Sequence, residues 1–222
     1  MKTDTQLLAD VQAELDWDPS VDNRGIVVAA KDGVVTLAGY VGTYADRWAA
    51  EKAAKAVAGV RAIANDIDVK LVTAAQRPDK DIAEAAANAL RSNVSVPAED
   101  IKVIVNNGWI TLEGKVPFWH QKNAAENAVR SLWGVKGISN CIDLKLAVSV
   151  PAVKVGDVQS KIQQAFHRHA TLDANKVNVA VSDGSITLTG EVRSWQEHDD
   201  AEQAAWAAPG VTRVQNMLSV HV

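Results

Sequence analysis

The sequence is poor in residue types on which several protein classes depend. It has one cysteine, Cys141, which excludes an internal disulfide and a cysteine-rich metal cluster. Because free cysteines are usually buried, we expect Cys141 to be a small core residue. No apolar run approaches the roughly 20 residues of a membrane-spanning helix, and the amino-terminal residues lack the apolar centre of a signal peptide. We therefore expect a cytoplasmic protein, or a periplasmic one if an export signal has been removed ahead of Met1.

An excess of positive charge is also lacking. The 23 Lys and Arg residues are outnumbered by 27 Asp and Glu residues, which gives a net charge of −4. Nucleic-acid binding normally needs a strong basic field, so no nucleic-acid partner is expected. With 47% apolar and 23% charged residues, the chain has the composition of an ordinary folded protein rather than a disordered one.

What the sequence does contain is one unit written three times. The segments DGVVTLAGYV, NGWITLEGKV and DGSITLTGEV occupy residues 32–41, 107–116 and 183–192, at steps of 75 and 76 residues. In each copy a Gly-Val pair follows 20 positions after the second glycine. Repetition at a fixed spacing indicates tandem copies of one structural unit. We expect three modules, at residues 1–73, 77–148 and 153–222.

Each unit predicts the order helix, strand, strand, helix, strand. Apolar side chains alternate on both sides of the Asp-Gly or Asn-Gly pair, which predicts two antiparallel strands joined by a type I′ turn. An apolar stripe precedes this hairpin and an alanine-rich segment follows it, and both have helical spacing. The glycine of the Gly-Val pair is expected to end the second helix as its C′ residue. The third strand contains an asparagine (Asn65, Asn140 or Asn216) that we expect to mark a bulge or a bend.

A crossover from the second strand through a helix to the third makes those two strands parallel. The predicted fold class is therefore α/β, or α+β, with three tandem αββαβ modules. Each module has a three-stranded mixed sheet with both helices on one face. The pattern leaves open whether the modules pack together or are joined as separate beads. The glycines that recur at equivalent positions are expected to serve the backbone: Gly33, Gly39, Gly59, Gly108, Gly114, Gly134, Gly184, Gly190 and Gly210.

The residues resemble a known family. The stretch from Asp32 to Val41, the alanine-rich helix, the Gly59-Val60 pair and Asn65-x-Ile67 are similar to the BON domain, named for bacterial OsmY and nodulation proteins. The likeness extends over all three units. It implies an α/β module that associates with phospholipid membranes or envelope proteins, often in osmotic or envelope stress, and that has no catalytic residues.

Seven tryptophans are the main candidates for a binding surface. Trp119 and Trp195 share a position with Tyr44 at the start of the second helix, where an aromatic side chain typically packs against the helix entry. Trp133 aligns with Ala58 and Pro209 and stays open. The other four align with a polar residue in at least one sister unit, so we expect them at module interfaces or partner surfaces: Trp17, Trp48, Trp109 and Trp206. We hypothesise that Trp48 or Trp206 binds outside its own chain.

Only the middle unit has a charge that suits an anionic lipid surface, because residues 76–150 carry 9 basic and 8 acidic groups. Lys122 and Arg130 on its second helix are the candidate lipid contacts. The alternative is an ordinary solvated surface, since Glu113 and Glu126 are interspersed with these cations.

Signals for catalysis or metal binding are weak. His167 and His169 are two residues apart and no third ligand is indicated, so no catalytic residue, metal site or cofactor is predicted. We expect a non-catalytic binding protein whose partner is membrane phospholipid or another protein. Two alternatives stay open: a cytosolic interaction scaffold or chaperone-like protein, and a small-ligand carrier or enzyme that uses a cleft between modules.

Overall fold

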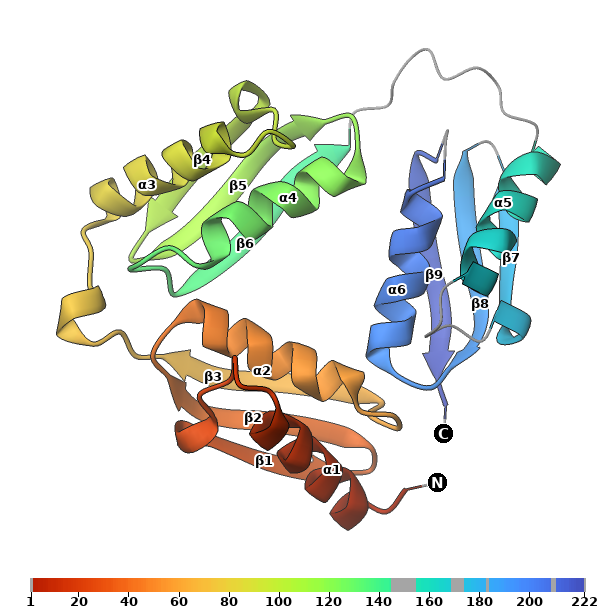
Figure 1. The fold of residues 1–222 in the computed structure, drawn as a ribbon, viewed down its shortest axis with the longest axis horizontal. Helices are drawn as coiled ribbons and strands as arrows, with labels where there is room; N and C mark the ends of the chain where they lie inside the picture. Colours follow the sequence, from red (N-terminus) through yellow and green to blue (C-terminus); the bar gives the residue numbers. More distant parts are fainter. Residues whose placement is uncertain (1, 145–154, 169–173, 183, 209–210, 222) are drawn as a thin grey trace.

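The computed structural model describes residues 2–144, 155–168, 174–182, 184–208 and 211–221. It shows three modules of one design, as the repeats predict (Figure 1). The helices and strands of module 1 are α1 Asp4–Trp17, β1 Ile26–Lys31, β2 Val34–Val41, α2 Tyr44–Ala56 and β3 Ala62–Val69. Those of module 2 are α3 Asp79–Ser92, β4 Ile101–Asn106, β5 Trp109–Val116, α4 Trp119–Arg130 and β6 Gly137–Leu144. Those of module 3 are α5 Val155–Arg168, β7 Val177–Ser182, β8 Ser185–Val192, α6 Trp195–Trp206 and β9 Arg213–Val220.

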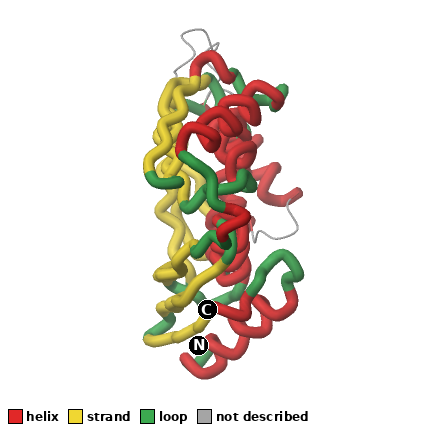
Figure 2. Tube along the Cα trace, turned by 90° about the vertical axis from the view of Figure 1, so that its left-hand side faces the viewer, coloured by secondary structure: helices red, strands yellow, loops and turns green. Residues whose placement is uncertain are grey.

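The three sheets have the predicted topology. In each, the central strand (β2, β5 or β8) pairs antiparallel with the strand before it and parallel with the strand after the crossover helix. Both helices of a module lie on the same face of its sheet, so the strands of all three modules form one layer and the helices form the other (Figure 2). The predicted αββαβ fold with a mixed three-stranded sheet is confirmed.

The type I′ turn is formed where the sequence places it. Asp32 and Gly33 have φ angles of 52° and 78°, and Asn107 and Gly108 have 51° and 81°, which is the pair of positive values that this turn requires. A carboxylate of the first helix binds each turn: Asp79 accepts hydrogen bonds from the backbone N–H groups of Asn107 and Gly108, at 2.7 and 2.8 Å. Asp4 binds the module 1 turn in the same way. The first-turn acid of α1 and α3 thus joins the helix to the hairpin.

Each module has its own core between helices and sheet. In module 2 the buried side chains include Ile82, Leu90, Ile110, Leu112 and Ile142, each at most 1% exposed. Modules 1 and 3 have equivalent cores. The stripes of apolar residues that predict the helices and strands are the ones that fill these cores.

Three local predictions are wrong. Cys141 is exposed, because it alternates with the buried Ile142 along β6 and therefore points to the outer face of the sheet. Asn65 and Asn140 interrupt no strand ladder, so they mark no bulge. Gly59 is not at the C′ position, since α2 is capped at Val57, two residues earlier.

Candidate functional site

The second helix of each module (α2, α4 and α6) is the element that meets the other modules, and an asparagine of the last strand fixes it to the sheet. The amide Nδ2 of Asn65 donates to Glu51 Oε2 on α2 at 2.9 Å, while its Oδ1 accepts from the backbone N–H of Ile67. Asn140 and Asn216 make the same contacts with α4 and α6. The recurring asparagine therefore fixes the position of the second helix on the sheet. It has this role in place of the bulge that the sequence predicts.

The first joint is the contact between α2 of module 1 and α4 of module 2. Tyr44 packs against the core of module 2. One turn further along α2, the guanidinium of Arg130 lies over the ring of Trp48, 3.6 Å from its centroid. Arg130 also pairs with Glu126 at 3.5 Å, and its side chain is only 15% exposed. Burial raises the pKa of the Tyr44 phenol, and the nearby Glu126 carboxylate raises it further.

The second joint is the contact between α6 of module 3 and α2 of module 1. Trp195, the first residue of α6, packs against the core of module 1. Asp199 pairs with Lys55 of α2 at 3.3 Å, and the backbone N–H of Gly59 donates to the carbonyl of Arg193 at 3.0 Å. A helix–helix contact, an ion pair and a backbone hydrogen bond thus connect two modules that are far apart in the sequence.

The ion pair of the second joint shifts the pKa values of both Lys55 and Asp199. Burial alone would lower the pKa of Lys55, but the attraction of Asp199 and Glu51 outweighs it, so the pKa of Lys55 lies above its ordinary value. Burial alone would raise the pKa of Asp199, but the hydrogen bond with His198 and the attraction of Lys55 outweigh it and lower that pKa. Both shifts favour the charged forms.

Both joints use the same positions of the repeat. Trp48 and Asp199 are equivalent residues of their second helices, and so are their partners Arg130 and Lys55. Tyr44 and Trp195 are equivalent as well, and each packs on the core of the next module. The modules are therefore joined head to tail by a repeated contact, and the compact arrangement that the sequence left open is the one observed.

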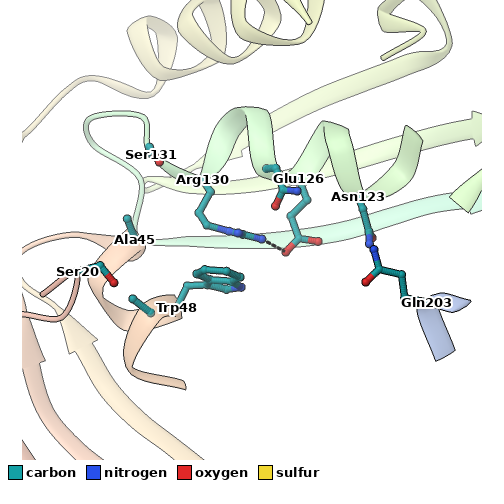
Figure 3. A pocket seen from close by; sticks show the side chains of 10 residues that line it. Ser20, Ala45, Trp48, Asn123, Glu126, Arg130, Ser131 and Gln203 are labelled. Atoms are coloured by element: carbon teal, nitrogen blue, oxygen red, sulfur yellow. Dashed lines mark ion pairs between the residues drawn. The ribbon is translucent and has the colours of Figure 1, made fainter. Parts of the chain in front are cut away.

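A cleft of about 630 Å³ lies where the three modules meet, and all three second helices contribute to it (Figure 3). Its lining is mostly polar, with Trp48, Glu126 and Arg130 on one side and Asn123 near Gln203 on the other. Among the described residues, no three His, Cys, Asp or Glu side chains gather as metal ligands would.

Two tryptophans are strongly exposed, one in module 1 and one in module 2. Trp17, at the end of α1, is 83% exposed, and Trp133, after α4, is 62% exposed. Trp17 shares a surface depression with Ala58, which is the residue equivalent to Trp133. Trp17 thus projects from the end of α1, whereas Trp133 follows α4 and precedes Gly134, which lies against Arg77 and Ile82 at the start of α3.

The other predicted surface residues are scattered. Trp109 is on the outer face of the module 2 sheet, where its Nε1 donates to Ser139 Oγ at 2.9 Å. Lys122 lies on α4 and its carbonyl accepts from Asn140. Trp206 is half-buried and its Nε1 donates to Glu202 of its own helix. A binding role outside the chain for Trp206, and lipid contact for Lys122 and Arg130, stay predictions; His169 lies outside the described residues.

The sequence shows which residues of the joints are equivalent, but not which of them are in contact. The equivalence of Trp48 with Asp199, and of Arg130 with Lys55, can be read from the repeats. Which of these positions meets which depends on how the modules are oriented, and no local pattern encodes that. No sequence pattern indicates that Glu126 or Arg193 takes part in a contact between modules.

Within the ranges that the structure describes, every helix is too short or too polar to cross a bilayer. The chain is 30% identical over 147 residues to Osmotically-inducible protein Y of Escherichia coli (strain K12), and this alignment covers 64% of the chain and 72% of that protein.

Likeness to solved structures is weaker. CdsD, a structural protein of the Type III secretion system of Chlamydia trachomatis, aligns over 97% of this chain and 92% of its own at 14% identity with a TM-score of 0.28. The CdsD C-terminal domain aligns over the whole of both chains at 13% identity with a TM-score of 0.25. Scores this low support no conclusion.

The family comparison is decisive because it finds each repeat separately. The model of the BON domain matches residues 3–70, 78–146 and 154–221, one match for each of the three modules that the structure shows. The chain is a member of the BON domain family.

Proposed function

We propose that this protein is a non-catalytic binding protein of osmotic or envelope stress, and that it associates with phospholipid membrane surfaces. Its similarity to an osmotically inducible protein supports the link to stress. The observation that carries the membrane proposal is the strong exposure of Trp17 in module 1 and Trp133 in module 2. Tryptophan is seldom left so exposed, and the headgroup region of a bilayer is one of the environments it prefers.

The charges near Trp17 and on α4 favour a contact driven by burial of the indoles over an electrostatic one. Trp17 lies near Lys2, Asp10 and Glu14, a mixed set. Arg130, one of the two cations suggested for lipid contact, is held between Trp48 and Glu126. Association should therefore depend on burying the two indoles and only modestly on anionic lipid.

Titration with neutral and with anionic vesicles, followed by tryptophan fluorescence, tests the proposal. We expect a blue shift, and we expect the double variant Trp17→Ala, Trp133→Ala to partition at least about tenfold more weakly. Burying half of an indole, about 100 Å², is worth about 2.5 kcal/mol. Trp109→Ala, on the outer face of the sheet, is the matched control and should partition like the parent protein. An unchanged partition of the double variant would contradict the membrane contact.

A protein partner is the second candidate, and the net charge of −4 favours it because the chain as a whole repels anionic lipid. Exposed tryptophans are also typical of the central residues of protein interfaces. If neither vesicle composition shifts the fluorescence, the membrane proposal is wrong and this candidate takes its place.

A further inference from the structure

The two joints follow one direction around the molecule. Module 3 places the start of α6 on module 1, and module 1 places the start of α2 on module 2. One further step of the same kind would place the start of α4 on module 3. That step would close a ring of three modules, since three equivalent heterologous contacts close when the rotation between neighbours is about one third of a turn.

Both halves of this third joint are present in the chain. Trp119, the first residue of α4, is equivalent to Tyr44 and Trp195. Trp206, the last residue of α6, is equivalent to Arg130 and Lys55, which receive the contacts of the first and second joints. The start of α4 faces the end of α6 (Figure 1), and Asn123 and Gln203 of these helices line the same cleft (Figure 3).

The contacts that would complete the third joint are absent from the part of the chain that the structure describes. There, Trp119 is half-buried but packs against none of the three cores, unlike its two equivalents. Its neighbour Phe118 is 56% exposed and stacks on His120. In the described part of the chain, Trp119 at the start of α4 and the end of α6 thus lie opposite each other without the packing seen at the other two joints.

We propose that Trp119 docks on α6 of the same chain, beside Trp206, and closes the ring of modules. The same chain is favoured over a second copy because the two modules are covalently linked and already adjacent, which gives a short-tethered partner an effective concentration in the millimolar range. The residues equivalent to the Asp199–Lys55 pair are here Asn123 and Trp206, so this joint has no ion pair. It is therefore the weakest of the three and the one through which the central cleft opens.

Chemical cross-linking in the full chain tests the proposal. Asn123→Cys and Gln203→Cys are introduced in a Cys141→Ser background and treated with a short bis-maleimide. We expect an efficient link within one chain. Adding Trp119→Ala should lower the linking rate at least about tenfold, because loss of a buried interfacial tryptophan typically costs this much or more. Trp133→Ala, an exposed tryptophan of the same module, is the matched control and should leave the rate unchanged.

A second variant keeps the test decisive if Trp119→Ala disturbs module 2. Trp206→Ala alters only the receiving helix in module 3, and it should lower the linking rate to a similar extent while circular dichroism shows the secondary structure intact. Rates unchanged in both variants would overturn the proposal. Links formed between chains rather than within one would also overturn it, and would assign Trp119 to a second copy of this protein.

Discussion

At the first joint a tryptophan ring lies under an arginine, whereas at the second joint an aspartate pairs with a lysine. The four residues occupy two equivalent positions of the repeat. The two joints therefore bring the same helix positions into contact, but through different types of side chain. What the joints share is the aromatic residue that begins the second helix, Tyr44 or Trp195, on the core of the neighbouring module. The comparison shows that the register of the contact is set by the aromatic start of the helix, and that the polar pair beside it is variable.

The largest effect is therefore expected from replacing the aromatic residue that begins a second helix. Trp195→Ala should destabilise the second joint by about 2 kcal/mol or more, as is typical of a tryptophan that anchors an interface. The amide of Gly59 reports this joint directly, because it donates to the carbonyl of Arg193 across it. We expect its hydrogen-exchange protection to fall about 30-fold or more, while amides in the core of module 1 keep theirs. Unchanged protection at Gly59 would show that Trp195 does not hold the joint.

A smaller effect is expected at the polar pair of the first joint. Arg130→Gln removes the cation from the ring of Trp48 and leaves Glu126 without its ion-pair partner. The coupling between Arg130→Gln and Trp48→Leu should be about 0.5–2 kcal/mol in a double-mutant cycle on the unfolding transition. Lys52, whose ammonium lies 5.4 Å from the centroid of the same ring but whose side chain is exposed, provides the control cycle and should show much weaker coupling. Equal coupling in the two cycles would contradict the special position of Arg130.

The smallest effect is expected from the ion pair of the second joint, which is half-exposed. Asp199→Asn should cost only about 0.2–1 kcal/mol, because water and salt screen such pairs. The pKa of Asp199 lies below its ordinary 3.8, and the part of this shift that comes from Lys55 acts across the joint, so the ion pair favours joining while this carboxylate is ionised. The contribution is complete above about pH 4 and is lost as the pH falls through the lowered pKa.

Protection of the Gly59 amide, measured as the pH is lowered from 6 to 3, checks this sign. The parent protein should lose protection in the acid part of the range, and Asp199→Asn should lose less. The nearby Glu51 and His198 are retained in both proteins, so they do not produce the difference. A pH dependence identical in the two proteins would exclude Asp199 as its source.

The sequence predicts the inside of a module far better than its outside. Hairpins, helices and the parallel crossover follow from short-range patterns, such as the Asp32-Gly33 pair that adopts the two positive φ angles of its turn. The usual burial of cysteine predicts a buried Cys141, but the side chain's exposure follows from its alternation with the buried Ile142 along the strand. The role of the recurring asparagine has no local signal, because its partners, Glu51 and its equivalents, are distant in the sequence.

The joints were beyond prediction for a different reason. The repeat shows that Lys55 and Arg130 are equivalent, but a contact between modules depends on orientations that no residue pattern within one module specifies. Only a structure shows that the start of one second helix meets the end of the next.

The most direct test of the repeated head-to-tail contact uses the unmodified protein. A carbodiimide joins a lysine to a carboxylate only when the two touch, so mass spectrometry of the treated monomer should find an amide bond between Lys55 and Asp199 within one chain, beside the bond expected between Lys2 and Asp10. Formation of the Lys2–Asp10 bond without the Lys55–Asp199 bond would show that modules 1 and 3 are not joined in this way.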